Sequence, residues 1–228
     1  MKKVDEIKKA CEINTRIFNE IIKNFNFKTE KDIEKFILKR FKDHRVRKAY
    51  HPIVSNNYAP ENPCNITELH KKPRKKKLEN GFLLLDFGAR YGKNASDMTR
   101  MLFIGKPTKK DKKLYKLILN CQEKCIKKVK PGANCKEIGL YAKKLLGQYN
   151  KYFCHALGHG VGYRIHQKPK ISRKSPHILK EDDIITIEPG IYLNKTISIR
   201  VEDTIHVTHN RPIILTKATK KLILVNLS

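Results

Sequence analysis

Residues 83–103 read LLLDFGARYGKNASDMTRMLF, with an apolar run at each end and a polar, glycine-containing middle. This pattern predicts two strands joined by a tight turn, that is, a β-hairpin. If the turn is centred between Tyr91 and Gly92, Asp86 lies directly opposite Asp97 and both carboxylates point to one face. Two like charges so close are destabilising unless a cation separates them, and carboxylate oxygens suit hard divalent metals. A pair of solvated aspartates flanking the turn is the alternative, but the apolar neighbours of Asp86 favour the metal.

Three of the nine histidines fall within residues 155–166, HALGHGVGYRIH. The glycines beside His159 allow backbone and ligands to approach it closely. Neutral imidazole is a common ligand of transition metals. Imidazoles that stay off the metal, such as His155 or His166, can stabilise a developing oxyanion by hydrogen bonding. The alternative is a set of structural histidines, and the density of the cluster makes this the weaker interpretation.

Two glutamates stand in apolar segments, Glu188 in residues 185–192 (ITIEPGIY) and Glu202 in residues 199–208 (IRVEDTIHVT). A carboxylate in such a strand needs a positive partner. Strand alternation puts Arg200 on the face of Glu202, so an ion pair between them is one interpretation and a metal ion the other. Four carboxylates and one imidazole suit two divalent ions better than a structural zinc site, which favours cysteine and histidine. The candidate metal ligands are Asp86, Asp97, His159, Glu188 and Glu202.

Helix and strand patterns are mixed along the chain, without an internal repeat or a long linker. This mixture, with hairpin-like strand pairs, predicts an α+β fold in a single domain that covers residues 1–228. Thr29 begins a capping pattern before the second helix. Helices are expected in residues 5–48, as a pair, and in 108–129 and 135–149; strands are expected in 82–104, 184–192, 197–208 and 221–225.

The formal net charge of +28 raises the question of a polyanionic partner. Lysine supplies most of the cations, and lysine is poorer than arginine at bidentate recognition of phosphates and bases. The densest basic run, residues 71–77 (KKPRKKK), has no aromatic side chain on which a base would stack. The sequence therefore argues against specific nucleic-acid binding.

The N-terminal residues are charged and lack the apolar run of a signal peptide. No segment reaches the roughly 20 consecutive apolar residues that a membrane span needs. The six cysteines are scattered without a CxxC pair, which predicts free thiols in a reducing compartment. Together these features predict a cytoplasmic protein.

The order and wording of the motifs are similar to those of a known enzyme family. The chain resembles the Xaa-Pro peptidase branch (Xaa-Pro dipeptidase and aminopeptidase P) of the pita-bread metallopeptidases, which also include methionine aminopeptidase and creatinase. The resemblance runs from about residue 5 to the C-terminus and rests on residues 83–100, 153–169, 185–192 and 199–208. The SDMTR form of residues 96–100 and the additional His155 favour the Xaa-Pro branch over methionine aminopeptidase.

The resemblance implies a curved, mainly antiparallel sheet flanked by helices and a site for two divalent ions, Mn or Co first and Zn or Fe as alternatives. Carried over by position, Asp97 and Glu202 bridge the ions, Asp86 completes one, and His159 and Glu188 complete the other. A hydroxide bridging the ions would attack the carbonyl that precedes proline, and Glu188 would shuttle its proton. The residues implied at the substrate are His70, His155 and His166, with Arg200 as a supporting residue beside Glu202.

The chain departs from the family pattern in three places. The first expected helix begins close to Met1, so the N-terminal domain that usually precedes the catalytic domain is not expected, and oligomeric state stays open. Gln167 stands where the family usually has glutamate, and Met101 where it usually has threonine. Three alternatives stay open: a methionine-type aminopeptidase, a non-catalytic basic binding module of this fold, and an enzyme acting on a small creatine-like molecule.

Overall fold

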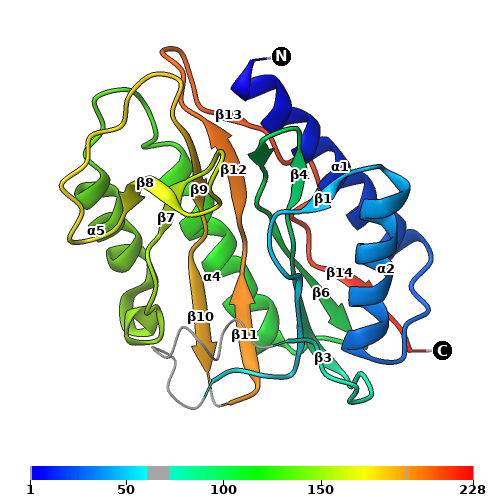
Figure 1. Cartoon of the computed structure of the whole chain (residues 1–228). Coiled ribbons are helices and arrows are strands. Elements are labelled where there is room, and N and C mark those ends of the chain that lie inside the picture. The colour runs from blue at the N-terminus through cyan, green and yellow to red at the C-terminus, as the bar shows by residue number, and fades with distance from the viewer. Residues whose placement is uncertain (1, 61–71, 194, 228) are drawn as a thin grey trace.

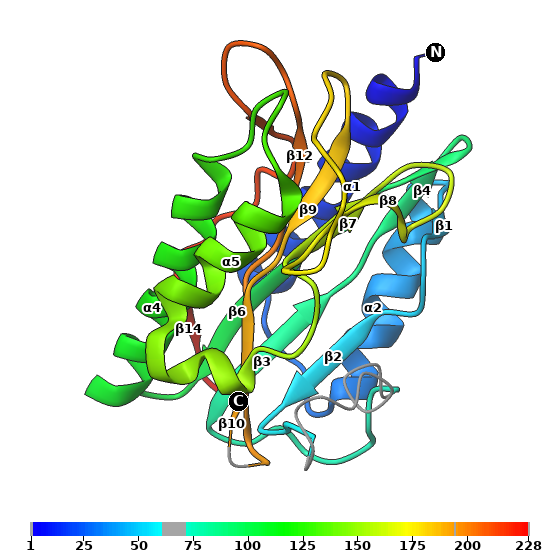
Figure 2. The ribbon, with the colours of Figure 1, turned by 90° about the vertical axis from the view of Figure 1, so that its left-hand side faces the viewer.

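The computed structural model describes residues 2–60, 72–193 and 195–227. Its strands form a central layer between two pairs of helices (Figure 1 and Figure 2). Helices α1 (Lys3–Lys23) and α2 (Glu30–Asp43) cover one side, and α4 (Lys109–Ile126) and α5 (Cys135–Leu146) cover the other. The α+β class predicted from the sequence is confirmed, and each predicted helix is present.

The strands pair in four groups, most of them antiparallel. The four-stranded sheet has the order β14 (Ile223–Val225), β6 (Thr99–Ile104), β3 (Gly81–Asp86), β2 (Ile53–Asn56). The five-stranded sheet has the order β13 (Ile213–Ile214), β12 (Asp203–His206), β9 (Ile184–Ile187), β7 (Gly158–Gly160), β8 (Gln167–Ile171). Strand β10 (Gly190–Leu193) pairs with β11 (Ile197–Arg200), and β4 (Ala89–Tyr91) lies between β1 (Arg47–Lys48) and β5 (Asn94–Ala95). A short 3-10 helix, η1 (Gly147–Tyr152), follows α5.

Strand β3 is apolar on both faces because helices cover both of them. Leu83 and Leu85 pack with the apolar side chains of α1 and α2. Phe82 and Leu84 point the other way and pack in the cluster that includes α4 and α5. A strand buried on both faces needs a continuous apolar run, so the LLL of this segment follows from its central place.

Capping boxes start α2 and α4. The Thr29 hydroxyl accepts from the Asp32 amide at 3.2 Å, and Asp32 accepts from the Thr29 amide at 3.0 Å. Thr108 and Asp111 make the same reciprocal pair at α4. Each box satisfies amide groups that have no partner within the helix. The capping pattern predicted at Thr29 is confirmed.

The hairpin register differs from the sequence-based prediction. Asp86 pairs with Thr99 across β3 and β6, not with Asp97, and the tip turns at Gly92 and the next residue. Gly92 has φ of +58°, a conformation that glycine adopts without steric cost, and this sets the turn one residue later than expected. Asp97 lies in the irregular segment before β6. It is therefore a diagonal neighbour of Asp86, and the expectation of directly opposed aspartates is wrong.

Both C-terminal strand segments break at their glutamates. The predicted strand over 184–192 is divided into β9 and β10 at Glu188 and Pro189, and proline has no amide hydrogen to continue a ladder. The predicted strand over 197–208 is divided into β11 and β12 at Glu202, whose amide donates to Thr99 O at 3.2 Å. The breaks place both carboxylates where the sheets meet.

Cys11, Cys121, Cys125 and Cys135 are free and buried. Cys154 is disulfide-bonded, so the prediction of free thiols is wrong at this residue. Sequence spacing could not reveal this bond, because the cysteines show no local pairing pattern. Within the described part of the chain, every helix is too short or too polar to cross a membrane.

Candidate metal and substrate site

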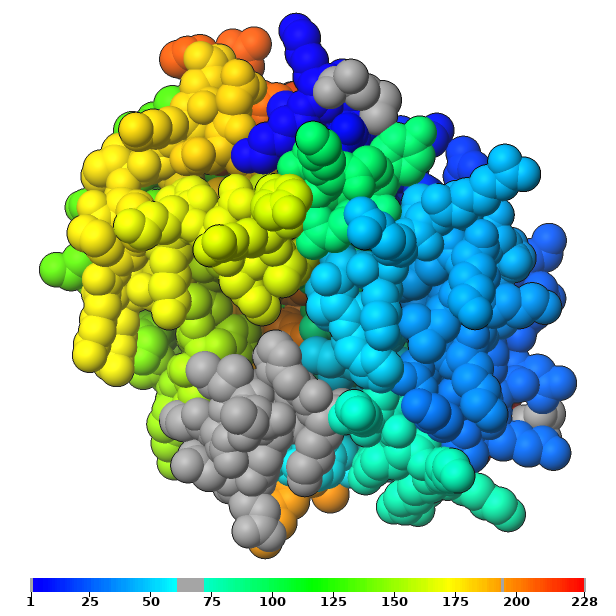
Figure 3. Space-filling view, viewed as in Figure 1, coloured from blue at the N-terminus to red at the C-terminus, as the bar shows by residue number. Residues whose placement is uncertain are grey.

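A cavity of about 660 Å³ contains all five candidate ligands on its wall. Figure 3 shows a hollow between the cyan segment around β2 and the yellow segment around β8. Segments far apart in sequence therefore form opposite walls of one site.

Asp86 and Asp97 form one part of the cavity floor. Asp86 ends β3, and both side chains are nearly fully buried. The Tyr50 hydroxyl lies between them, 2.5 Å from Asp86 Oδ1 and in short contact with Asp97 Oδ1. Burial, followed by the charges of Asp86 and Asp97, raises the pKa of Tyr50 well above its ordinary value, so the phenol stays a neutral donor.

His159 and Glu188 form the second part. His159 Nε2 lies 3.2 Å from Glu188 Oε1 and 3.6 Å from Asp97 Oδ2. The buried Thr186 hydroxyl accepts from the His159 amide at 3.1 Å and donates to Glu188 Oε1 at 3.2 Å. A Cβ at Gly158 would lie 1.9 Å from Thr186 O, so glycine is required beside His159 as the sequence indicated.

Glu202 lies between these two parts. Its Oε2 accepts from the Thr99 hydroxyl at 2.7 Å. Arg200 forms its ion pair with Asp86, donates from Nε to Thr99 Oγ1 at 3.1 Å, and donates from Nη1 to Tyr192 at 2.9 Å. The Arg200 guanidinium therefore forms its ion pair with Asp86, whereas the sequence analysis considered Glu202 as its partner.

Four carboxylates, three of them buried, crowd the site with negative charge. Burial, then the charges of Asp97, Glu188 and Asp86, raises the pKa of Glu202 well above its ordinary value. Burial and Asp86 raise the pKa of Asp97 to about 7. Burial alone would raise the pKa of Glu188, but the hydrogen bond and charge of His159 lower it to about 2. Divalent cations would remove the repulsion that raises the first two pKa values.

Three overlapping groups of side chains have ligand atoms within 4.8 Å of one another. Asp97, His159 and Glu202 each belong to two of the groups, so the three groups form one connected cluster of ligand atoms. The oxygen-rich donor set with imidazole fits two hard or borderline divalent metals. The groups are Asp86 with Asp97 and Glu202; His159 with Glu188 and Glu202; and Asp97 with His159 and His166.

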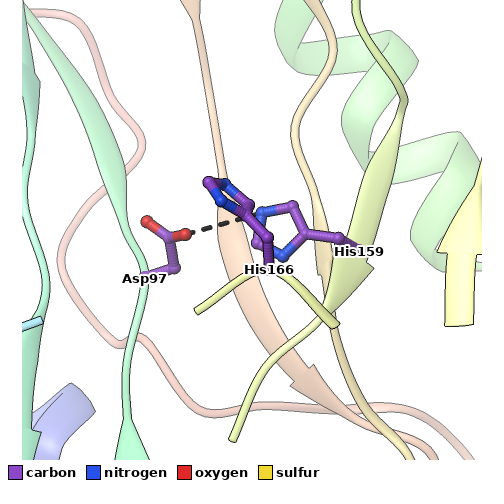
Figure 4. Close-up of side chains that lie close together, drawn as sticks. All are labelled: Asp97, His159 and His166. Carbon is purple, nitrogen blue, oxygen red and sulfur yellow. Dashed lines mark ion pairs between the residues drawn. The ribbon is translucent and has the colours of Figure 1, made fainter. Parts of the chain in front are cut away.

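His166 and His155 lie at the cavity beside this cluster. Figure 4 shows Asp97 directed toward His159, with the His166 ring against that imidazole. The two ring centroids are 4.4 Å apart, and the third group above offers His166 as a further ligand, a role the sequence did not suggest. His155 Nε2 lies 3.0 Å from the Tyr192 hydroxyl and its Nδ1 lies 2.8 Å from Ala156 O, so its ring is held at both nitrogens.

The profile of metallopeptidase family M24 (Peptidase_M24) matches residues 5–209. The chain belongs to this family. The M24 chain is 35% identical over 227 residues to an Xaa-Pro dipeptidase of Pyrococcus horikoshii and 34% identical to one of Pyrococcus furiosus. These alignments cover 97% of the chain but only 63% and 64% of the relatives. The chain thus spans a little under two thirds of the length of these proteins.

Solved structures show the same likeness to the M24 chain. An X-Pro aminopeptidase from Thermotoga maritima has a TM-score of 0.89 at 30% identity, covering 98% of this chain and 63% of that one. A prolidase from Pyrococcus horikoshii has a TM-score of 0.88 at 32% identity, covering 97% and 63%. The pita-bread fold and the family resemblance expected from the sequence are confirmed.

Sequence reasoning missed several residues of the M24 site. Tyr50, Thr99 and Thr186 contact candidate ligands, yet each is a common residue type without a spacing signal. Tyr192 ends the quoted segment ITIEPGIY, but only the neighbouring residues of that segment were recognised as belonging to a site. His70 lies outside the described residues and stays a prediction.

Proposed function

We propose that this M24 chain hydrolyses the Xaa-Pro bond at the N-terminus of peptides or in Xaa-Pro dipeptides, using two divalent metal ions. The observation that carries the proposal is the convergence of five candidate ligands from distant segments on one cavity. We assign residues 1–228 to a single catalytic domain, because the family match spans residues 5–209 and the cavity wall draws on residues from Tyr50 to Glu202. The cytoplasmic location expected from the sequence stays a prediction.

The proposed ligands are Asp86, Asp97, His159, Glu188 and Glu202. Divalent ions bound there would make water nucleophilic near neutral pH and polarise the scissile carbonyl. The oxygen-rich set supports Mn or Co first, with Zn or Fe as alternatives.

The remaining steps belong to protein side chains. We assign the water proton to the Glu188 carboxylate, which lies on the cavity wall with its Oε1 3.2 Å from His159 Nε2. We assign His166, which is exposed in the cavity wall, to the developing oxyanion. His155 would act on the substrate side through its contact with Tyr192, which Arg200 in turn holds.

The cavity also supports a short peptide as substrate. Lys168, Lys170 and His177 also lie on its wall, and Lys170 pairs with His159 across β7 and β8. A peptide carboxylate is attracted by such a basic wall. Proline at the second position has no amide hydrogen and a fixed φ, so its ring must be recognised by packing. Ile53 offers an apolar wall for that ring.

The first experiment measures hydrolysis of Ala-Pro, a longer Xaa-Pro peptide and Met-Ala-Ser by chelated protein to which Mn, Co, Zn or Fe is returned. Metal-dependent cleavage before proline is the expected result, and the relative rates on the two Xaa-Pro substrates separate a dipeptidase from an aminopeptidase. Cleavage of Met-Ala-Ser alone would identify a methionine-type aminopeptidase. Metal binding without any hydrolysis would favour the non-catalytic binding module.

Asp97→Ala tests the ligand assignment. Loss of this carboxylate should abolish turnover and weaken metal binding, because Asp97 belongs to two of the ligand groups. Asp43→Ala, at the exposed end of α2, is the matched control and should leave both unchanged. Full activity of Asp97→Ala would reject the assignment.

A further inference from the structure

Glu202 is held by Thr99 and Arg100, the first two residues of β6. Its amide donates to Thr99 O at 3.2 Å, and its Oε2 accepts from the Thr99 hydroxyl at 2.7 Å. Its carbonyl oxygen accepts from Arg100 Nη1 at 2.5 Å. Main chain and side chain of Glu202 are thus both fixed by Thr99 and Arg100, so these two residues set the separation of Glu202 from Asp97.

The Arg100 guanidinium links three segments of the chain. Only 1% of Arg100 is exposed. Nη1 also donates to Thr99 O at 2.9 Å, so one nitrogen joins the carbonyl groups on both sides of the Thr99–Glu202 bridge. Nε and Nη2 donate to Ala218 O at 3.1 and 3.0 Å. The planar fork of arginine can make these bonds together, whereas lysine has one nitrogen.

Asp203 is the counterion of this buried cation. Its Oδ1 accepts from Arg100 Nη2 at 2.6 Å and from the Thr216 hydroxyl at 2.7 Å. Its Oδ2 accepts from Gln122 of α4 at 2.8 Å and lies 3.1 Å from Lys220 Nζ. The carboxylate is fully buried and directly follows Glu202 in the chain. The pair is therefore anchored from α4 and from the C-terminal segment.

A second ion pair, in which only the carboxylate is buried, shows what a purely structural pair looks like in this molecule. Glu30, 2% exposed, pairs with Arg74 at 2.5 Å and accepts from the Asn56 amide at 2.8 Å. These contacts join α2 to β2 and the following loop, and none of them is to a candidate ligand. The Arg100–Asp203 pair differs because its donors bond the main chain of Glu202 itself.

We propose that the buried Arg100–Asp203 pair is a positioning device that sets the distance between the shared ligands Asp97 and Glu202 and thereby the affinity for the metal pair. This inference rests on the proposed function, because it requires that the cluster binds metal. Arg100 acts through Glu202, and we assign it no contact with the substrate. Partners that orient metal ligands change metal affinity by about 10- to 100-fold when they are removed.

The test compares wild type, Arg100→Lys and Glu30→Gln as chelated proteins titrated with Mn2+ in a calorimeter. Arg100→Lys keeps the charge opposite Asp203 but cannot bond all the carbonyl groups. We expect wild type to bind two ions and Arg100→Lys to bind at least one of them about tenfold more weakly. Glu30→Gln should lose thermal stability while binding both ions as wild type does. A melting curve for each protein separates the two effects.

Electron paramagnetic resonance of the Mn-loaded proteins gives a second readout. An exchange-coupled Mn pair is expected in wild type and Glu30→Gln, and uncoupled Mn in Arg100→Lys. If Arg100→Lys does not fold, Asp203→Asn decides by the same measurements, since it keeps an acceptor for Arg100 but removes the counterion charge.

Three results would overturn the inference. The first is wild-type affinity and a coupled Mn pair in the folded Arg100→Lys protein, or in Asp203→Asn if that variant must be used. This result would reject the positioning role and leave the proposed function intact. Equal loss of affinity in Glu30→Gln and Arg100→Lys would reduce the effect to general stability. A wild-type protein that binds no ion would overturn the proposed function and this inference with it.

Discussion

At His159, burial and neighbouring charges act on the imidazole in opposite directions. Burial lowers the pKa of His159, but the hydrogen bond and charge of Glu188, followed by Asp97, raise it to about 9. Burial and Asp86 raise the pKa of the neighbouring Asp97 to about 7. A metal ion requires neutral imidazole and ionised carboxylate. Binding at neutral pH must therefore displace protons from both groups.

The pH dependence of metal affinity follows from these pKa values. The metal-free protein binds more protons than the loaded protein, so the affinity for Mn2+ should rise with pH and level off above about pH 9. Calorimetry in two buffers of different ionisation enthalpy measures the protons released per ion. Proton-free binding at pH 7 would contradict the proposed part of His159 and Asp97.

Tyr50 is the side chain between two candidate ligands. Its hydroxyl has one proton and so donates to only one of Asp86 and Asp97 at a time. Tyr50→Phe removes a group that orients both carboxylates, and we expect a loss of metal affinity of about tenfold. Tyr141→Phe on α5, outside the cavity wall, is the control. Unchanged Mn2+ affinity in Tyr50→Phe would show that the carboxylates need no such partner.

At the scale of elements, α1 supports the ligand hairpin. Asn14 is fully buried on α1 and donates to Phe87 O at 3.2 Å and Ser96 Oγ at 2.8 Å. It also accepts from the Ala89 amide at 2.9 Å. Phe87 directly follows Asp86, and Ser96 directly precedes Asp97. One amide side chain thus ties the helix to both branches of the hairpin.

Asn14→Ala should destabilise the protein. The substitution leaves buried partners unsatisfied, and each such group costs about 1–3 kcal/mol. We expect the free energy of unfolding in urea, measured in the presence of a chelator, to fall by about 2–3 kcal/mol. The control Asn120→Ala lies on the exposed face of α4 and should change it by less than about 0.5 kcal/mol. Equal effects of the two substitutions would refute the supporting role of Asn14.

At the scale of the whole molecule, the site connects two parts of the chain that pack into separate apolar clusters. The apolar cluster of α1 and α2 and the cluster of α4 and α5 lie on opposite sides of the strands. The candidate ligands come from β3, the segment before β6, β7 and the two broken strands. Metal ions bound there would link these parts, and only the folded state brings the ligands together to bind them.

Metal removal should therefore lower thermal stability. When the free concentration of the ion is about 100 times its dissociation constant, binding stabilises the folded state by about 2.7 kcal/mol. For a chain of this size, this corresponds to a rise in melting temperature of roughly 5–10 °C. Differential scanning calorimetry with a chelator and with added Mn2+ measures the shift. Asp97→Ala should show little metal-dependent shift, and a full shift in this variant would place the stabilising ion elsewhere.

The sequence alone determined the local features of this protein. Helix periodicity, the Thr29 cap and the apolar strands depend on neighbouring residues, so they predicted the elements and the α+β class. Asp86, Glu188 and Glu202 were found because charged groups in apolar surroundings need a partner, wherever the fold then places them. His159 was found through the density of histidines around it, and Asp97 through its place in the hairpin segment. The family resemblance added the pita-bread fold, which the comparisons confirm.

The tertiary structure decided how these features meet. Gly92 moved the turn by one residue, so Asp86 faces Thr99 and reaches Asp97 only diagonally. The partners Tyr50 and Arg100 have no sequence signal, because contacts across many residues of separation depend on how the sheets pack. Local pattern records which side chains must be buried or paired; only packing in three dimensions determines with which partner.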